Sequence, residues 1–410
     1  AYAYWELMDF YGGVPLDTVY PSPGIQARAS RADIFNFVES ELKTVIPYLK
    51  TEVDASTYGK PTQYFAYSLL ANLYLNAEVY TGSAKNDECI AACDAIISSG
   101  KYSVQSRDSY LKMFYPDNGP TTQSEFIFAI PYDPSTSSGY LFYGRYDLNR
   151  NLGMKYKYSG ATVGTNVDPV VNQTTGNGLV NSKPSGPRAT LSTFLDYFLA
   201  DENDIRLKQW LYGPQYWDNG NPIMVKTTNL GYNQFYSGSD GGSSYVYHLN
   251  IDTSIKLRQN PALFDCGNDE IAWNQGARNI KFFPDAGSTT RNQNNDAPVS
   301  RYSDVLLMKA EAILRGGAAT SGQTALSLVN MVRAERTKSP GWASVDLEDL
   351  YEERCREFAW ECLHRNDMIR FGKYENLYGF KTNTDTYRRL FPIPTTAITA
   401  NGKLEQNTGY

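Results

Sequence analysis

The sequence predicts a mainly α-helical protein in which tetratricopeptide-like helical hairpins build a superhelix that carries a long loop-rich insertion and short strands. Apolar residues recur at helical spacing in two blocks, 1–100 and 300–371, which we interpret as the scaffold. Residues 101–299 break instead into short strand-like or irregular pieces rich in Gly, Asn, Ser, Tyr and Pro. With 410 residues, 41% of them hydrophobic, the chain can bury a large core. We therefore expect a single domain over 1–410 that ends in an irregular segment at 372–410.

The first helices form an N-terminal block. Residues 1–16, AYAYWELMDFYGGVPL, have the pattern of the second half of an amphipathic helix that enters a Gly-Gly-x-Pro turn. Because no helix start, initiator Met or signal peptide precedes them, we expect an N-terminal portion to be missing. Helical period recurs in 31–50, 61–80 and 85–99. The last two segments predict two antiparallel helices joined by a short turn.

The middle of the chain contains one clear helical segment, LSTFLDYFLA, at 191–200. Long irregular segments within a compact domain are more often binding loops than structural filler. We therefore expect the ligand-binding region at 101–299.

Helical period returns at 300–315, 322–337 and 346–371. Glycines separate the first two segments, so they predict a second hairpin of about the length that a tetratricopeptide unit needs. The likeness is one of helical architecture, because the sequence pattern of that repeat is not present.

Two charged stripes lie within these apolar helices. Their members are Arg301, Asp304, Glu311 and Arg315 in one stripe and Arg354, Glu357, Glu361 and Arg365 in the other. Steps of 3, 4 or 7 residues place side chains on one helical face. We interpret them as a partly buried ion-pair network between helices, in which Arg301, Asp304 and Glu311 face Arg333 or Arg336 and the second stripe.

Glu357 and Glu361 allow a catalytic alternative. Their Cβ atoms are expected about 5–6 Å apart, near the spacing of the two carboxylates of a retaining glycosidase. An arginine lies within a turn on either side, however, and favours the ionised form, whereas a general acid needs a raised pKa. We therefore favour the structural interpretation and do not expect an enzyme.

Composition favours a binding protein. Aromatic residues make up 14% of the chain and include 32 Tyr, whose flat ring and polar tip suit surfaces that grip sugars or peptides. A net charge of −6 without a basic run argues against nucleic-acid binding. Two histidines leave little room for a zinc site or His-based catalysis, and no apolar run reaches the length of a membrane span. We expect the cysteine pairs Cys89/Cys93 and Cys355/Cys362 to be core thiols.

Several motifs together resemble the SusD/RagB family of Bacteroidetes nutrient-binding proteins. They are RYSDVLLMKAEAILRGG, LVNMVRAERT, YEERCREFAWECLHRNDMIRFGKY and FPIPTTAITANGKLEQNTGY, in this order, with FLDYFLADENDIR and PTQYFAYSLLANLYLNAEVYTG before them. The opening AYAYWELMDFYGGVPL is similar to that family's helix and aromatic-Gly-x-Val-Pro turn. The resemblance spans nearly the whole chain.

The resemblance implies a lipid-anchored protein on the outer face of the outer membrane. Such a protein would act as a lid on a SusC-like TonB-dependent transporter and capture oligosaccharide without cleaving it. A peptide-binding member of the same family is the nearest alternative, and a glycoside hydrolase that uses Glu357 and Glu361 is a further one. Members of the family normally begin with a lipoprotein signal and a lipidated Cys, and the absence of both fits the expected missing portion. Their sugar-binding residues vary, so none is transferred by motif.

Sugar recognition needs aromatic faces that stack on C–H surfaces beside side chains that hydrogen-bond to hydroxyls. Three aromatic clusters in the insertion meet this need. Their candidate ligand-binding residues are Trp210, Tyr216, Trp217, Asp218 and Asn219 in the first cluster, Tyr232 in the second and Trp273 in the third. For each aromatic residue, packing against the helical layer is the alternative.

Two polar turns, DNGNP at 218–222 and SGSDGG at 237–242, offer oxygen ligands of the kind that Ca²⁺ prefers. Neither has the spaced acidic series and distal Glu of an EF-hand loop. We therefore expect turns there, and no cofactor or metal.

Overall fold

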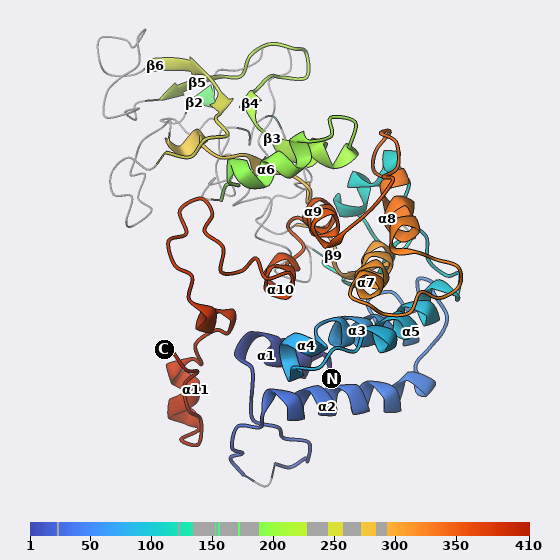
Figure 1. Ribbon diagram of the computed structural model, residues 1–410. Coiled ribbons are helices and arrows are strands. Elements are labelled where there is room, and N and C mark those ends of the chain that lie inside the picture. The colour runs from blue at the N-terminus through green and yellow to red at the C-terminus, as the bar shows by residue number, and fades with distance from the viewer. Residues whose placement is uncertain are drawn as a thin grey trace.

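The computed structural model describes residues 1–22, 24–121, 124–133, 152, 155, 171–172, 188–227, 245–256, 272–283 and 293–410. It is a mainly α-helical protein, as the sequence predicts, with most of its short strands gathered at one end (Figure 1). Helices from the two ends of the sequence pack together, and the segment between them carries the strands. The N-terminal helices are α1 (Tyr2–Tyr11), α2 (Arg31–Val45), α3 (Gln63–Leu75), α4 (Ala77–Thr81) and α5 (Asn86–Ile97).

Local signals set the boundaries of the N-terminal helices. A capping box opens α2, because Ser30 Oγ accepts a hydrogen bond from Asp33 N and the Asp33 side chain accepts one from Ser30 N. The turn after α1 requires glycine. Gly12 has φ +74°, and a Cβ on Gly13 would lie 2.2 Å from the carbonyl oxygen of Ala29. This turn directs the chain from α1 toward α2.

The C-terminal helices complete the scaffold. They are α7 (Tyr302–Leu314), α8 (Ala325–Ala334), α9 (Leu347–Glu357), α10 (His364–Arg370) and α11 (Thr395–Ala400). Both α3 and α5 pack against α7, and α8 covers the other side of α7 (Figure 1). The largest apolar core lies between them; its members include Leu73, Ile96 and Val305, none of which is exposed to solvent.

The insertion leaves and rejoins the scaffold at neighbouring strands. Strand β1 (Phe126–Ile130) pairs antiparallel with β9 (Ala297–Arg301), so that Ile130 faces Ala297. Beyond them, β2 (Val171–Asn172), β5 (Met224–Thr227) and β6 (Tyr245–His248) form a small sheet. The remaining strands form two-stranded pairs: β3 (Trp210–Leu211) with β8 (Arg278–Asn279), and β4 (Gly213–Pro214) with β7 (Asn250–Ile251). Helix α6 (Ser192–Leu199) and the 3-10 helix η7 (Ile205–Gln209) connect this region to α9.

The structure corrects the predicted helix at 346–371, which is two helices. Helix α9 ends at Glu357, and both Trp360 and Cys362 adopt the left-handed conformation, with φ of 63° and 66°. The carbonyl oxygens that a continuing helix would use internally accept hydrogen bonds from elsewhere. Lys281 Nζ donates to Glu357 O at 2.9 Å and to Ala359 O at 3.2 Å. Glu361 therefore does not continue the helical face of Glu357.

The structure also moves two other residues from where the pattern placed them. Arg301 is the last residue of β9 and only precedes α7, so the first stripe begins on a strand. Cys89, Cys93 and Cys355 are buried free thiols as expected, whereas Cys362 is exposed because its left-handed backbone lies in the break between α9 and α10. Within the described part of the chain, no helix is both long enough and apolar enough to cross a membrane.

Asp346→Ala is expected to lower the free energy of unfolding by about 1 kcal/mol. The exposed Asp346 carboxylate caps α9 by accepting hydrogen bonds from Glu348 N at 2.8 Å and Asp349 N at 2.9 Å. Alanine leaves both groups to water. Urea unfolding followed by circular dichroism measures the change, and Asp346→Asn, which keeps an oxygen acceptor, should lose less. Equal losses in the two variants would contradict the capping role.

Candidate ligand-binding site

A buried charge cluster fixes the position of α9, which forms the base of the candidate site. Glu357 is fully buried and faces three arginines from three separate segments. Its carboxylate accepts hydrogen bonds from Arg206 at 3.0 Å, Arg301 at 2.9 Å and Arg336 at 2.9 Å. Burial opposes its ionisation, but the arginines prevail and hold the pKa of Glu357 well below its usual range. Such a carboxylate stays ionised and is unsuited to act as a general acid.

The other stripe residues form ion pairs as well, most of them with separate segments of the chain. The remaining pairs are Asp304 with Arg354, Glu311 with Arg315 and Arg370, Glu361 with Lys281 and Arg301, Arg333 with Glu353, and Arg365 with Asp9. Three partners differ from expectation. Arg333 and Arg336 face Glu353 and Glu357 rather than the stripe on α7, and Arg365 reaches α1. Arg206 and Lys281 add two cations from the insertion that the stripes did not reveal.

A cleft of about 440 Å³ opens beside this cluster, between α6, α9, α10 and the segment that follows α10. We call it the aromatic cleft. It is lined by Thr190, Leu191, Thr193, Phe194 and Tyr197 from one side, by Tyr351, Arg354, Cys355, Phe358, Ala359 and Trp360 at its base, and by His364, Asp367, Met368, Lys373, Asn376, Leu377 and Tyr378 from the other. Its volume lies within the range of about 300–1,000 Å³ that small-molecule sites occupy.

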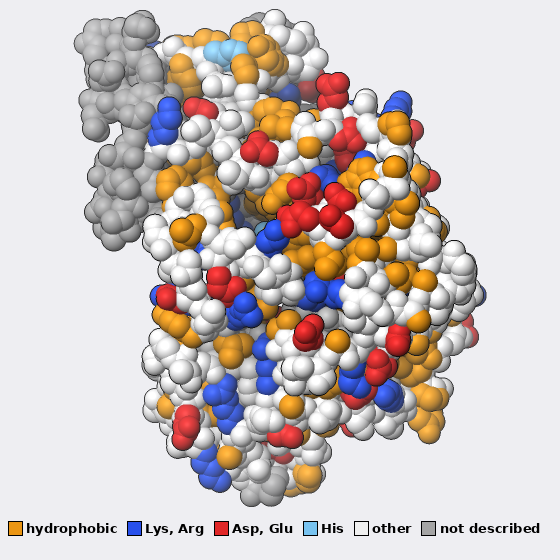
Figure 2. Space-filling view, viewed as in Figure 1, with side chains coloured by type: hydrophobic (Ala, Val, Ile, Leu, Met, Phe, Trp, Pro, Cys, Tyr) orange, Lys and Arg blue, Asp and Glu red, His pale blue; other side chains and the backbone are white. Residues whose placement is uncertain are grey.

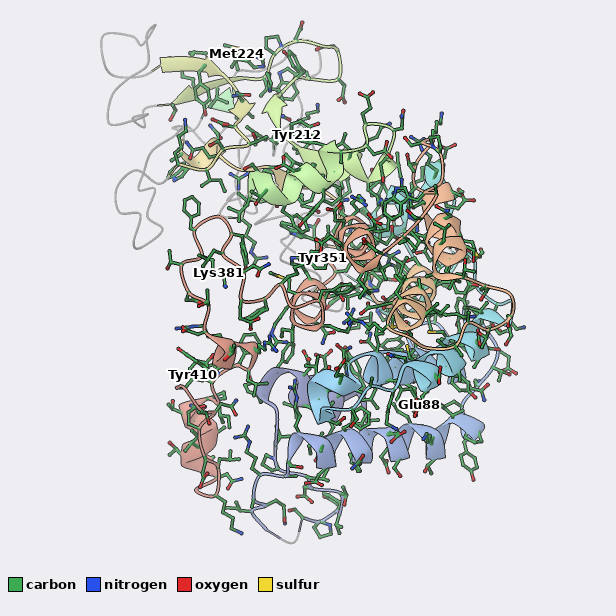
Figure 3. The ribbon with its side chains drawn as sticks, in the orientation of Figure 1. Glu88, Tyr212, Met224, Tyr351, Lys381 and Tyr410 are labelled. Atoms are coloured by element: carbon green, nitrogen blue, oxygen red, sulfur yellow. The ribbon has the colours of Figure 1, made fainter. Side chains whose placement is uncertain are left out.

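The residues that line the cleft differ in how deeply they are buried. Tyr351 at the base and Asp367 on α10 are buried, Phe194 and Tyr197 are half-buried on α6, and Tyr378 is 42% exposed at the rim. Figure 3 shows Tyr351 on the scaffold and Lys381 on the loop that follows α10. Figure 2 shows hydrophobic side chains among groups of acidic and basic ones around the middle of this face. The cleft therefore offers ring faces behind an open rim.

One polar group in the cleft has its hydrogen-bonding capacity unused. Thr190 is 4% exposed, and its Oγ1 has no hydrogen-bond partner among the residues that the structure describes. A buried hydroxyl without a partner costs on the order of 1–3 kcal/mol, so a ligand or water that meets it stabilises the protein. Thr190 is held in place by its backbone, whose N–H donates to Ala277 O at 2.9 Å. The site thus contains a fixed, unsatisfied hydroxyl.

His364 and Cys355 lie together in the cleft without the features of a catalytic pair. The Cys355 sulfur is 3.8 Å from His364 Nδ1. Burial raises the pKa of Cys355 far above its usual range, so the sulfur remains a thiol. Burial also lowers the pKa of His364, which Asp367 offsets in part. Both groups are neutral at neutral pH and act as polar parts of the wall.

The structure places two of the expected ligand contacts in the interior. Trp210 and Trp217 are each 4% exposed, so neither ring presents a face to a ligand in this structure. Trp210 packs edge-on against Phe198 and Trp360, with ring centroids 5.0 and 5.3 Å apart, and so supports the cleft from behind. Trp217 belongs to the core under the small sheet, with Ile223.

The other candidates lie away from the cleft, at the strand-rich end. Tyr216 is 46% exposed and contacts the His248 ring at 5.0 Å between centroids. Asp218 and Asn219 are exposed in the turn that follows it. Trp273 is half-buried in the 3-10 helix η9 (Ala272–Asn274). Tyr232 lies outside the described residues, so the structure brings only Tyr216, Asp218 and Asn219 together on one surface.

Sequence reasoning missed the aromatic residues of the cleft because they come from three separate segments: the isolated helix at 191–200, the helical scaffold and the C-terminal irregular segment. Phe194 and Tyr197 are spaced by three residues on α6, which is a signal of one exposed helical face. Tyr378 follows a helix end in an irregular segment. No local pattern connects these segments with Tyr351, which lies more than 150 residues from α6.

Across the residues that the structure describes, His, Cys, Asp and Glu side chains nowhere form a group of three or more that could hold a metal ion. The first polar turn, 218–222, is described as a turn closed by a hydrogen bond from Gly220 N to Trp217 O at 3.0 Å. The second, 237–242, lies outside the described residues.

The sequence is similar to that of known proteins. The sequence model of the SusD family matches residues 124–410, which is more than half of the chain. The starch-binding protein SusD of Bacteroides thetaiotaomicron is 24% identical over 423 residues, which cover 99% of this chain and 70% of that protein. A SusD-like protein of Formosa agariphila is 22% identical and covers 100% of this chain and 72% of its own length.

Solved structures share the fold. Surface glycan-binding protein A from Bacteroides uniformis superposes with a TM-score of 0.66 at 19% identity, over 99% of this chain and 75% of that one. The corresponding protein from Bacteroides thetaiotaomicron, solved in complex with laminarihexaose, gives a TM-score of 0.58 at 19% identity, over 99% and 76% of the two chains. Because the family's sequence model matches most of this chain and solved members share its fold, the chain belongs to the SusD family.

Proposed function

We propose that the protein binds oligosaccharide at the cell surface and passes it to a SusC-like TonB-dependent transporter in the outer membrane, to which a lipid anchor holds it. The aromatic cleft carries the binding part of this proposal. It combines rings on which a sugar can stack with a buried hydroxyl at Thr190 that has no hydrogen-bond partner in the described part of the chain. The names of the relatives, which bind starch and glycans, support the same class of ligand. Family membership supports the location and the transporter.

Capture without cleavage fits the charges of the site. A retaining hydrolase needs one carboxyl group whose pKa is raised toward neutrality. The arginines around Glu357 lower its pKa instead, and Glu361 is engaged by Lys281 and Arg301. We therefore propose binding and hand-over, with Glu357 and Glu361 in a structural role.

Tyr378→Ala is expected to weaken oligosaccharide binding about tenfold, because a stacked ring contributes on the order of 1–2 kcal/mol. Tyr378 lies at the rim and is 42% exposed, so its loss should leave the fold intact. Isothermal titration against a panel of oligosaccharides measures the effect. Tyr48→Ala is the matched control, because Tyr48 is 85% exposed and lies outside the cleft, after α2.

Three outcomes would argue against this proposal. Binding of peptides but of no oligosaccharide would favour the peptide-binding alternative. New reducing ends that appear with the wild-type protein and vanish in Glu357→Gln would show hydrolysis. Flat titrations with every ligand, together with co-purification of a transporter, would indicate an assembly role alone.

A further inference from the structure

The charges around the aromatic cleft are satisfied within the protein. Arg354 lines the base, and its Nε donates to Asp367 at 2.9 Å while its Nη1 donates to Asp304 at 2.9 Å. Asp367 also receives Arg370 Nη2 at 2.7 Å. Among the described residues that line the cleft, the one buried cation and the one buried carboxylate are therefore already paired with each other.

The ion pairs continue from Asp367 away from the cleft, and each further charged group again has a partner of opposite charge. Arg370 binds Glu311 with Nε at 2.6 Å and Nη2 at 2.9 Å, and Arg315 binds the same carboxylate at 2.8 Å. This chain of contacts contains three cations, Arg315, Arg354 and Arg370, and three carboxylates, Asp304, Glu311 and Asp367. Its net charge is zero, so it offers no counter-charge to a ligand.

The wall and rim are uncharged or paired. Lys373 binds Glu348 and lies 5.6 Å from the centre of the Tyr351 ring. His364, which faces Phe194, Tyr351, Cys355 and Asp367, is neutral at neutral pH because burial lowers its pKa. Thr193, Asn376 and Tyr378 at the rim are neutral hydrogen-bonding groups.

We propose that the aromatic cleft selects uncharged sugar rings and discriminates against rings that carry a carboxylate or sulfate. The inference rests on the proposed oligosaccharide binding and specifies its ligand class. A neutral ring stacks on the aromatic wall while one of its hydroxyls meets Thr190 Oγ1. An acidic ring would lose the hydration of its charge without gaining an unpaired cation from the described lining, and burial of an uncompensated charge is strongly unfavourable.

The experiment compares matched oligosaccharides by isothermal titration: a neutral glucan oligomer, and the same oligomer oxidised at C6 to uronic acid or sulfated. We expect the neutral form to bind at least tenfold more tightly. Equal or tighter binding of an acidic form would overturn the inference while leaving the proposed function standing. Failure of every saccharide to bind would overturn the proposed function itself, and the inference with it.

Two variants tie the selectivity to the cleft. Thr190→Val removes the hydroxyl at constant shape and should weaken binding of the neutral oligomer three- to tenfold, whereas Thr51→Val, at an exposed position outside the cleft, should not. Asn376→Lys places an unpaired cation at the exposed rim and should shift the preference toward the acidic forms at least fivefold. If the preference for the neutral oligomer is the same in both cleft variants as in the wild type, the binding site lies elsewhere and the assignment of this preference to the aromatic cleft is overturned.

Discussion

Glu357→Gln is expected to lower the free energy of unfolding by about 3–5 kcal/mol, the usual cost of breaking a buried ion pair on one side. The amide has the shape of the carboxylate but not its charge. Arg206, Arg301 and Arg336 would then share fewer carboxylates in a region that excludes water. Urea unfolding of the two proteins measures the difference.

Glu88→Gln is the matched control for this prediction. Glu88 is labelled in Figure 3 on α5, is 49% exposed and pairs with Lys85 at 3.5 Å. Exposed pairs contribute about 0–1 kcal/mol, so this variant should unfold almost as the wild type does. A loss in Glu357→Gln no larger than that in Glu88→Gln would refute the idea that the cluster stabilises the fold.

Stability is expected to fall steeply in acid as the buried carboxylates take up protons. Arg206, Arg333 and Arg356 outweigh burial and lower the pKa of Glu353 from 4.5 to about 2. A depressed folded-state pKa contributes stability that is fully present above pH 4.5 and is lost as the pH falls toward 2. For Glu353 this contribution is on the order of 3 kcal/mol. Glu357 acts in the same direction, whereas burial raises the pKa of Asp304, whose protonation therefore favours folding.

Urea midpoints measured from pH 2.5 to pH 7 test this expectation. Wild-type stability should drop between about pH 4.5 and 2.5, and Glu353→Gln should start lower and show a shallower drop, because it has no proton to take up at that position. Parallel pH profiles for the two proteins would be inconsistent with a depressed pKa at Glu353.

The helical scaffold could be predicted because its signals are local. Apolar spacing marks each helix, and residues such as Ser30 and Gly12 mark where helices begin or end. Charged stripes showed that helices would be tied together. They did not show which partners meet, because Arg206 and Lys281 lie far away in the sequence from the carboxylates they neutralise. The break after Glu357 was missed for the same reason, since a distant lysine satisfies the carbonyl groups at that helix end.

The binding residues could be predicted only by composition. An aromatic run such as the one around Trp210 contains both core and surface residues, and alternation along a two-residue strand is too short to separate them. Trp210 is buried because α6 and Trp360 pack over it, which only the tertiary structure determines. The aromatic cleft in turn joins three segments that are separate in sequence.

The pairing of β1 with β9 has a consequence for how members of this family can diverge. Residues 131–296 leave and return at adjacent strands, so their length can change at little entropic expense, about 0.6 kcal/mol for each doubling. A foreign segment could therefore be grafted between Ile130 and Ala297. We expect successful grafts to need a counterpart of Arg206 and one of Lys281, because these two cations alone connect the segment to the carboxylates of Glu353, Glu357 and Glu361 among its described ion pairs. The ligand-binding residues of the segment can then change freely, provided that the counterparts of Arg206 and Lys281 are kept.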